Sequence, residues 1–422
     1  MDISVTRNSC RLCGGHSLES VLDLGLQALT GVFPSSAEAD PPSVPLALLI
    51  CENCMLLQLR ESVDPTLMYK AYWYRSGIND TMNQHLKSLA DEVIAKLGPA
   101  SSGIWIDIGC KDGTLLRYAE ESKLTRIGVD PSNAIEEIDD PAILKVNDFF
   151  PSAELSKAMS EQKAKVITSI SMFYDLDEPA VFIEAIKAHL DTDGIWVLEM
   201  NYTLDMISNL GYDMVSHEHV TYYTLLSFSK LLAGTGLHIN DVSRNNINGG
   251  SIRIFVSFSE QIESAVTDLL EEEKSSGLDK RESYLTFADA VESYGAYMSS
   301  LLRDLSATGY KIAAYGASTR GNTLLQHWGI TQREVYVCAD KNPGKVGLRT
   351  PGSSIPIKSE DEVRASKPDF FLVLPYSFID EFEIREKKFL EKGGRFIVPL
   401  PSPYEVSLVD GRVLRRPLKN SV

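Results

Sequence analysis

One segment constrains the fold more than any other, Ile104-Trp-Ile-Asp-Ile-Gly-Cys-Lys-Asp-Gly-Thr-Leu-Leu116. An apolar strand that breaks into a glycine-bearing loop and then a helix brings bare backbone and a helix N-terminus up to a ligand. The next apolar run ends at Asp130, a carboxylate that can grip ribose hydroxyls. The pattern predicts an α/β domain that binds a nucleoside.

The chemistry of this loop narrows the ligand. The loop lacks the three-glycine pattern of dinucleotide sites and the Gly-Lys-Ser/Thr sequence of phosphate loops. Asp107 would repel a pyrophosphate and suits a cationic ligand. S-adenosylmethionine carries a ribose, an amino group and a sulfonium but no phosphate. We therefore predict S-adenosylmethionine as the cofactor.

Further apolar segments follow in the order of a methyltransferase sheet. Helical stretches separate most of them, as crossovers between parallel strands require. The last two are joined by a stretch short enough for a hairpin, which predicts an antiparallel end strand. Seven strands with that ending resemble the class I methyltransferase fold. The segments after the first are Arg126–Ser132, Ile143–Asp148, Val166–Phe173, Gly194–Tyr202, Leu237–Arg244 and Ser251–Phe258.

The resemblance to this fold implies a set of cofactor contacts at the methionine end, the ribose and the adenine. Simple core packing is the alternative for the Phe149-Phe150 pair. The implied contacts are Asp107, Gly109, Lys111 and Gly113 at or near the methionine end, Asp130 at the ribose, and Asp148 and Phe149 at the adenine.

Length and charge limit the class of protein. A chain of 422 residues suggests two to four domains. The net charge of −17 argues against nucleic acid or anionic membranes as partners. No apolar run approaches about 20 residues, and the N-terminus lacks the apolar stretch of a signal peptide. We expect a soluble, cytoplasmic protein, for which a monomer is one option.

Four of the six cysteines form two pairs near the N-terminus, Cys10-Arg-Leu-Cys13 and Cys51-Glu-Asn-Cys54. Two such knuckles complete a closed tetrahedral zinc site, and disulfides are the weaker explanation in a cytosolic chain. Four cysteine ligands leave no open position, so the zinc should be structural. We expect the intervening segment, Gly14–Ile50, to loop out, and Cys110 and Cys338 to be buried thiols.

Two polar or aromatic segments are candidates for the reacting site. Three tyrosines, a tryptophan and an arginine lie in the stretch Tyr69–Gly77, which either packs between domains or roofs an active site. The segment Val215-Ser-His-Glu-His-Val-Thr-Tyr-Tyr-Thr224 carries the groups best suited to take a proton near neutral pH. An adjacent carboxylate can fix the tautomer of a histidine. Metal binding by the His-Glu-His triplet and a solvated polar loop are the alternatives.

A second α/β unit begins at Lys311-Ile-Ala-Ala-Tyr-Gly-Ala-Ser-Thr-Arg-Gly-Asn322, after an acidic helical stretch at Glu260–Ser306. Its loop carries Ser318, Thr319 and Arg320, hydroxyls and a cation suited to phosphate oxygens. A helix should follow at about Thr323–Trp328. A pure packing domain is the alternative. Further strands are expected at Val335–Asp340, Asp369–Pro375 and Arg395–Pro401.

As a set, these segments resemble the sugar C-methyltransferases that act on nucleotide-linked deoxyketosugars. The resemblance rests on the cysteine pairs, the Tyr-x-Tyr-Arg-Ser-Gly segment, the Asp-x-Gly loop, His-Glu-His, Asn248-Gly-Gly-Ser251 and the Tyr-Gly-Ala-Ser-Thr-Arg-Gly loop. It implies a zinc domain at 1–66, a methyltransferase domain at 67–259, a helical connector at 260–306 and a Rossmann-like domain at 307–422. The nucleotide sugar would lie between the methyltransferase domain and the Rossmann-like domain.

The resemblance also implies roles for individual residues. His219 would remove the C3 hydrogen beside a C4 ketone, and the resulting enolate carbon would attack the methyl group. An O- or N-methyltransferase on a nucleotide sugar and a non-catalytic zinc-dependent binding protein are the rival hypotheses. The catalytic candidates are His219, Glu218, Tyr74 and Tyr222, and the substrate-binding candidates are Tyr72, His217, Asn248, Ser251, Ser318, Thr319 and Arg320.

One segment departs from the family pattern. Many members carry Pro-Leu-Ala-Asn after the first cysteine pair, where this chain has Leu26-Gln-Ala-Leu-Thr-Gly-Val-Phe33. If that loop touches substrate, this chain takes a different sugar or holds it differently.

Overall fold

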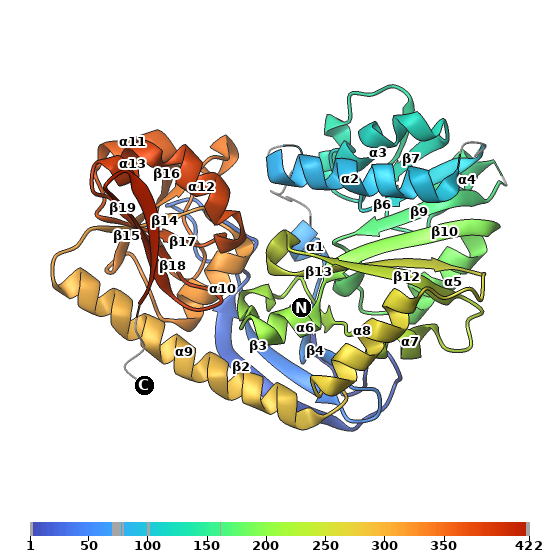
Figure 1. Cartoon of the computed structure of the whole chain (residues 1–422), viewed down its shortest axis with the longest axis horizontal. Helices are drawn as coiled ribbons and strands as arrows, with labels where there is room; N and C mark the ends of the chain where they lie inside the picture. Colours follow the sequence, from blue (N-terminus) through green and yellow to red (C-terminus); the bar gives the residue numbers. More distant parts are fainter. Residues whose placement is uncertain (1–2, 70–76, 78–79, 99–101, 161, 419–422) are drawn as a thin grey trace.

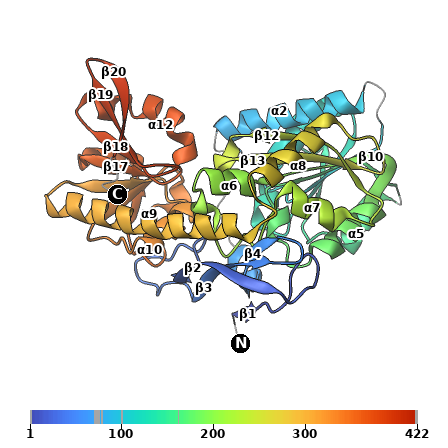
Figure 2. The ribbon, with the colours of Figure 1, turned by 60° about the horizontal axis from the view of Figure 1, so that its bottom comes forward.

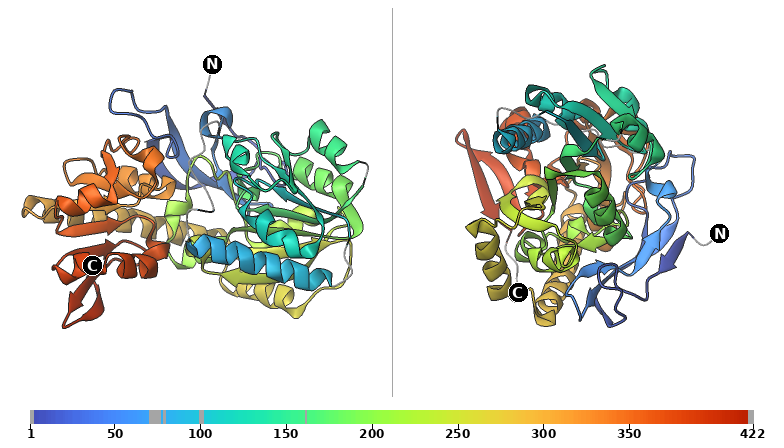
Figure 3. Two further views of the ribbon diagram at one scale, coloured as in Figure 1. Left: turned by 90° about the horizontal axis from the view of Figure 1, so that it is seen from above. Right: turned by 90° about the vertical axis from the view of Figure 1, so that its right-hand side faces the viewer.

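Two seven-stranded sheets lie at opposite ends of the molecule and are bordered by an N-terminal β domain (Figure 1). The computed structural model describes residues 3–69, 77, 80–98, 102–160 and 162–418. The N-terminal strands lie at the junction of the two larger α/β units, as the view from above shows (Figure 3). This arrangement places three parts of the chain around one point.

The first seven-stranded sheet has the strand order β12-β13-β10-β9-β6-β7-β8. β13 is antiparallel to both of its neighbours, and the other pairings are parallel. This confirms the predicted class I methyltransferase sheet with its antiparallel end strand. The strands are β6 (Ile104–Ile108), β7 (Thr125–Val129), β8 (Ile143–Val146), β9 (Ala164–Ile170), β10 (Leu190–Asn201), β12 (His238–Asn245) and β13 (Ser251–Ser257).

Helices cover both faces of this sheet because its strands are apolar on both sides. Trp105 of β6 packs in the core under α2, whereas its neighbours Ile104 and Ile106 belong to the core that contains Phe182 of α5. The helices are α2 (Asp80–Leu97), α3 (Thr114–Tyr118), α4 (Ala153–Met159), α5 (Pro179–His189), α6 (Thr203–Ser208) and α7 (Leu225–Leu232). The short 3-10 turns are η2 (Ala119–Ser122), η3 (Asn133–Glu137), η4 (Phe173–Asp175), η5 (Tyr212–Met214) and η6 (Ile247–Gly249).

The N-terminal domain is built on a long antiparallel hairpin. The expectation that Gly14–Ile50 loops out is wrong, because β2 (Leu18–Ala28) pairs with β3 (Ser43–Cys51) along most of their length. β3 is an apolar run that is buried almost throughout, so it needs a partner strand. The sheet order is β11-β4-β3-β2, and β11 (Thr221–Tyr222) comes from the methyltransferase part of the chain. The remaining elements are β1 (Ser4–Thr6), β4 (Leu57–Leu59), β5 (Glu61–Val63) and α1 (Thr66–Tyr69).

Two helices form the acidic connector, as expected. α8 (Ser264–Ser275) lies against β12, and α9 (Arg281–Ala307) extends from the methyltransferase end of the molecule to the C-terminal sheet (Figure 2). One face of α9 is buried along its length, from Tyr284 to Leu302. Among the described residues, neither this helix nor a shorter one has the length and apolar character needed to cross a membrane.

The C-terminal sheet has the order β16-β15-β14-β17-β18-β19-β20, with the first five strands parallel. This confirms a Rossmann-like unit, although the sequence did not predict β16, β19 or β20. α10 begins at Thr319 and not near Thr323, because Ser318 caps it by accepting a hydrogen bond from Gly321 N at 2.9 Å. The strands are β14 (Ile312–Tyr315), β15 (Val335–Asp340), β16 (Ile357–Ser359), β17 (Phe370–Val373), β18 (Arg395–Val398), β19 (Tyr404–Val409) and β20 (Arg412–Pro417). The helices are α10 (Thr319–His327), η7 (Pro343–Lys345), α11 (Glu360–Ala365), η8 (Tyr376–Phe378), α12 (Ile379–Arg385) and α13 (Lys387–Glu391).

A buried carboxylate fixes the start of α7, the helix that follows the His-Glu-His segment. Glu273 of α8 accepts hydrogen bonds from Leu225 N at 2.5 Å, Leu226 N at 2.8 Å and the Tyr202 hydroxyl at 2.7 Å. The two backbone donors are the first of the helix, which have no partner within it.

Replacing this carboxylate should destabilise the methyltransferase part of the chain. We expect Glu273→Gln to lower the free energy of unfolding by about 2–4 kcal/mol, because an amide cannot accept all three hydrogen bonds. Urea unfolding followed by circular dichroism measures the change. Glu271→Gln, on the exposed face of the same helix, is the matched control and should change stability by less than about 0.5 kcal/mol. Equal stability of the two variants would contradict the capping role.

Candidate active site

A cavity of about 370 Å³ lies where the three parts of the chain meet. The glycine loop after β6 contributes one wall, and the His-Glu-His segment contributes a second. The loop after β14 contributes a third wall, and Gly31 of the N-terminal domain also lines the cavity. Residues from four distant stretches of sequence therefore face one shared cavity.

The glycine loop places Asp107, Gly109 and Lys111 on the cavity wall. Gly109 has φ +76°, a conformation that favours glycine, and its N–H donates to Val129 O at 2.8 Å. Gly113 does not line the cavity. It is the N-cap residue of α3, and a Cβ there would lie 3.0 Å from the Ile138 side chain. Close packing therefore requires glycine at position 113.

Asp107 is a buried carboxyl at the base of the cavity. It accepts a hydrogen bond from the Thr168 hydroxyl at 2.7 Å. Burial disfavours its ionised form and raises its pKa to about 7. A cationic ligand beside Asp107 would stabilise the ionised form.

Asp130 lies beneath the glycine loop and ties it in place. Its carboxylate accepts hydrogen bonds from Lys111 N at 2.9 Å and from Ser132 N at 2.8 Å. Asp148 and Phe149 follow β8 on the surface, outside the cavity lining, and Phe149 is 56% exposed. Phe150 is the member of the aromatic pair that packs inward, 5.0 Å from the ring of Phe182.

His219 presents a neutral imidazole to the cavity. Its Nδ1 lies 2.8 Å from Met214 O and donates to it, so Nε2 carries no proton in the neutral ring. Burial lowers the pKa of His219 to about 4. The expectation that a carboxylate fixes this tautomer is wrong, because a backbone carbonyl does so.

Glu218 is the second titratable group of this segment in the cavity wall. Burial raises its pKa to about 7, while the charges of Lys111 and Lys345 act in the opposite direction. His219 and Glu218 therefore have pKa values displaced in opposite directions by the same cause, loss of water. At neutral pH the histidine is a free base and the carboxyl is close to its midpoint.

Two other residues of this segment do not reach the cavity. His217 is buried, and its Nε2 contacts Val44 O of β3 at 3.0 Å. Tyr222 is buried in β11, which pairs with β4 of the N-terminal sheet. Within the described ranges, the His-Glu-His triplet forms no cluster that could hold a metal ion.

Arg320 joins the C-terminal loop to the methyltransferase sheet. Its guanidinium donates to Asp213 at 2.7 and 2.8 Å and to the backbone oxygen of Asn248. Ser318, Thr319 and Asn248 line the cavity with it. The guanidinium is therefore engaged by a carboxylate of the chain itself. Ser251 is buried behind the wall, where its hydroxyl donates to Ile247 O at 2.9 Å. The predicted Tyr72 and Tyr74 lie outside the described residues.

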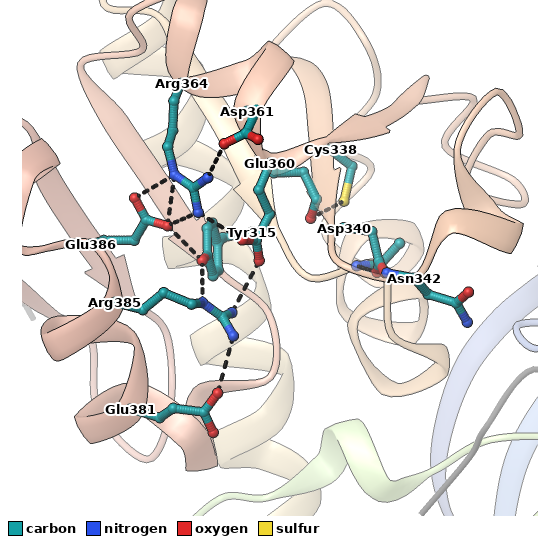
Figure 4. Close-up of polar contacts among 12 residues, drawn as sticks. Tyr315, Cys338, Asp340, Asn342, Glu360, Asp361, Arg364, Glu381, Arg385 and Glu386 are labelled. Atoms are coloured by element: carbon teal, nitrogen blue, oxygen red, sulfur yellow. Dashed lines mark hydrogen bonds and ion pairs between the residues drawn. The ribbon is translucent and has the colours of Figure 1, made fainter. Parts of the chain in front are cut away.

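The cavity also has a polar end that the sequence did not predict. Tyr315 donates to Glu386 at 2.7 Å and accepts from Arg385 at 2.9 Å, and Arg385 also pairs with Glu360 and Glu381 at 3.0 Å (Figure 4). Tyr315, Glu360, Glu381 and Arg385 line the cavity. Tyr315 lies in β14, Glu360 in α11, and Glu381 and Arg385 in α12, so spacing along the chain carried no signal for the contacts between these three elements.

The four N-terminal cysteines form a compact thiol cluster. All four Sγ atoms lie within 4.8 Å of one another, with Cys10 and Cys54 3.5 Å apart and Cys13 and Cys51 3.6 Å apart. A zinc–sulfur bond of about 2.3 Å gives sulfur–sulfur edges of about 3.8 Å, so the cluster fits zinc. It is a closed structural site, as predicted. Cys110 and Cys338 are separate buried thiols.

The fold and the glycine loop define a methyltransferase of the S-adenosylmethionine-dependent class. Three family models match the chain in order, a zinc-binding domain at 10–69, a methyltransferase domain at 82–242 and a C-methyltransferase C-terminal domain at 246–401. The C-methyltransferase NovU of Streptomyces niveus is 29% identical over 414 residues, which cover 96% of this chain and 98% of that protein. The chain is therefore similar along its length to C-methyltransferases in which these three domains follow one another.

Solved structures overlap with less of the chain. The plantazolicin methyltransferase BpumL, in complex with an analogue and SAH, has a TM-score of 0.33 and 14% identity, and covers 42% of this chain and 84% of its own. An S-adenosylmethionine-dependent methyltransferase of Clostridium acetobutylicum has a TM-score of 0.33 and 12% identity, and covers 42% of this chain and 92% of its own.

Removing one zinc ligand should release the metal and destabilise the N-terminal domain. We expect Cys51→Ser to lose the zinc and more than about 3 kcal/mol of stability, because zinc binding supplies folding free energy. Elemental analysis and thermal unfolding measure both changes. Cys338→Ser, at a buried thiol far from the cluster, should keep one zinc per chain. Full zinc content in Cys51→Ser would contradict the assignment.

Proposed function

We propose that this enzyme methylates a ring carbon, C3, of a nucleotide-linked 4-keto-deoxysugar through an enolate. The observation that carries the proposal is the shared cavity, in which the glycine loop, His219 and the Ser318–Arg320 loop face one another. The relative NovU is named a C-methyltransferase, which supports methylation at carbon. The resemblance of the motif set to sugar C-methyltransferases supports the nucleotide sugar as substrate.

The residues at the methyltransferase end of the cavity fit S-adenosylmethionine. A buried carboxyl, Asp107, suits the positive charge of the ligand, and the apolar side chains of Met82 and Leu86 line the wall nearby. We assign Asp107, Gly109 and Lys111 to the methionine end, with the predicted Gly113 placed behind them at the start of α3. Asp130 is assigned to the ribose, and Asp148 and Phe149 to an adenine held near the surface. When bound, the cofactor supplies an electrophilic methyl group.

His219 is the proposed base. Its Nδ1–H is engaged by Met214 O, which leaves the lone pair of Nε2 to accept the proton from C3. The low pKa keeps this nitrogen unprotonated at physiological pH. Ionised Glu218 would then stabilise the imidazolium that forms.

The enolate oxygen needs hydrogen-bond donors, each of which is worth a few kcal/mol. Asn248 is the candidate that lines the cavity, and its backbone is held by Arg320. Tyr74, or alternatively Tyr72, remains a proposed contributor from the aromatic segment. Ser251, Tyr222 and His217 lie behind the wall, so their predicted contacts with substrate are not part of the proposal.

The hydroxyls of Ser318 and Thr319 are the proposed contacts to the diphosphate of the nucleotide. Both lie at the start of α10, where backbone N–H groups favour anions. The pairing of Arg320 with Asp213 makes it a support of this loop and not a free phosphate ligand.

Loss of the ribose carboxylate should weaken cofactor binding. We expect Asp130→Ala to reduce the affinity for S-adenosylmethionine at least tenfold, or about 1.4 kcal/mol, because the variant loses both the ribose contact and the support of Lys111 N. Isothermal titration calorimetry measures the affinity, and circular dichroism confirms the fold. Asp139→Ala, at an exposed carboxylate nearby, is the control. Unchanged affinity in Asp130→Ala would remove the pocket assignment.

The enolate mechanism predicts exchange of the substrate hydrogen with solvent. In D2O, a panel of 4-keto-6-deoxy nucleotide sugars should gain deuterium at C3 with the wild type, in the presence of the demethylated cofactor. His219→Asn should lose this exchange and turnover while its cofactor affinity stays nearly intact. Mass spectrometry and NMR of the product identify a carbon-linked methyl group. Methyl gain at oxygen or nitrogen, without exchange, would favour an O- or N-methyltransferase.

The rate of methyl transfer should depend on the ionisation of Glu218. Below a pH of about 7 this carboxyl is protonated and above it ionised, whereas His219 is already neutral above about 4. At saturating cofactor and substrate, kcat should therefore rise with pH through about 7. Glu218→Gln should lower the plateau and abolish the rise. A rise that persists unchanged in Glu218→Gln would assign it to another group.

A further inference from the structure

We infer that Gly31 of the zinc-bearing domain is a positioning residue for the Glu218 carboxylate, so that the N-terminal domain takes part in setting up the reaction. The inference deepens the proposed function, because it rests on Glu218 acting in the cavity. It concerns a contact between two domains that neither the family models nor the sequence motifs assign.

The contact is a close steric approach. A Cβ added at Gly31 would lie 2.1 Å from Glu218 Oε1 and 3.3 Å from Glu218 Cδ. The φ angle of Gly31 is outside the left-handed region, so backbone conformation does not require glycine there. The carboxylate itself requires it, because it occupies the space that a side chain would fill.

The partner in this contact is the tip of a flexible side chain. A methyl group at position 31 would therefore displace the carboxylate and leave the backbone in place. The next atom from the added Cβ is Thr319 Oγ1 at 3.8 Å, an ordinary van der Waals contact. Substitution at Gly31 should act on Glu218 before it acts on the fold.

The loop that carries Gly31 is held by the C-terminal domain on both sides. Before Gly31, Asn322 Nδ2 donates to Thr30 O at 2.8 Å, and Gln326 Oε1 accepts from Ala28 N at 2.8 Å. After Gly31, the Lys345 ammonium lies 4.5 Å from the ring centroid of Phe33.

Two further backbone contacts hold the same loop against the C-terminal domain. Arg349 N donates to Pro34 O at 2.9 Å, and Ser35 forms an isolated antiparallel bridge with Leu348. These contacts hold the backbone at Gly31 in place without substrate. The backbone can therefore limit how far the Glu218 carboxylate moves towards it.

The electrostatic setting explains why the position of this carboxylate matters. Glu218 is shielded from water, and among the described residues the ammonium groups of Lys111 and Lys345 act on its charge. Lys345 donates to Ala317 O at 2.6 Å, so the C-terminal domain fixes one of these charges. Displacement of the carboxylate into the cavity would expose it to water and lower its pKa towards the ordinary value, because burial is the main cause of the shift.

The direct test is Gly31→Ala, with kcat measured across pH at saturating cofactor and substrate. We expect kcat to fall at least tenfold and the rise in kcat to move to a pH below that of the wild type. Zinc content and thermal midpoint should stay at wild-type values. Val32→Ala, the next residue in the loop and one that packs away from the cavity, is the matched control and should keep kcat and its pH dependence.

The double variant Gly31→Ala/Glu218→Asp tests the contact itself. Aspartate is one methylene shorter, so it can retain its buried position beside an alanine. We expect the double variant to be at least threefold more active than the product of the two single effects predicts. The inference would be overturned if the double variant had only the activity that the product of the two single effects predicts, or if Gly31→Ala behaved like the wild type.

A substrate-free measurement separates this inference from the proposed function. The Glu218 carboxyl can be titrated by infrared difference spectroscopy of the zinc-loaded wild type against Glu218→Gln, and the same difference can be taken in the Gly31→Ala background. A lower pKa in that background supports the contact even if no ketosugar is methylated. An unchanged pKa overturns the contact even if carbon methylation is found.

Discussion

The cavity depends on an ion pair between domains, in which the partly buried Arg320 binds the fully buried carboxylate of Asp213. Arg320 comes from the first turn of α10 and Asp213 from η5, so the pair holds the carboxyl edge of the C-terminal sheet against the methyltransferase domain. Tyr376 donates to the second oxygen of Asp213 at 3.2 Å, and Arg320 also donates to Asn248 O. Loss of one member would leave the other charge buried without its counterion, which is strongly unfavourable. The pair therefore fixes how the cofactor loop, the base and the second loop face one another.

Loss of water in this cavity sets its chemistry. The same burial lowers the pKa of His219 and raises the pKa values of Glu218 and Asp107. A neutral histidine can accept a proton, and a carboxyl near its midpoint can change its charge at neutral pH. The different protonation states of these groups follow from their burial where the three domains meet.

Much of the fold could be predicted from the sequence because the strands of parallel sheets are short apolar runs between helices. This pattern predicted the glycine loop after Ile108, the order of seven strands and the antiparallel end strand. The hairpin of β2 and β3 was not predicted, because the long spacing between the two cysteine pairs indicated a loop. The strands β19 and β20 were missed because β19 has one buried residue and β20 has none, and half of the residues of β20 are arginines, so both lack the apolar pattern of a core strand.

Site residues that are adjacent in the sequence could be predicted, whereas contacts between distant segments could not. His219 and Glu218 stand out because imidazole and carboxylate are adjacent in the chain, and both line the cavity. The tautomer of His219 is set by the backbone carbonyl of Met214. Every residue has such a carbonyl, so the residue type at position 214 could not indicate this role. Gly31 and the network of Tyr315 with Arg385 act through contacts between distant segments, which a single sequence does not encode in its spacing.

The most direct test of the account is a crystal structure of the zinc-loaded enzyme with S-adenosylhomocysteine and a 4-keto-deoxy nucleotide sugar. We expect the sugar ring to lie in the shared cavity, with C3 between the cofactor sulfur and His219 Nε2 and with the Glu218 carboxylate in contact with Gly31. A sugar bound outside this cavity, or one whose C3 faces away from His219, would contradict it.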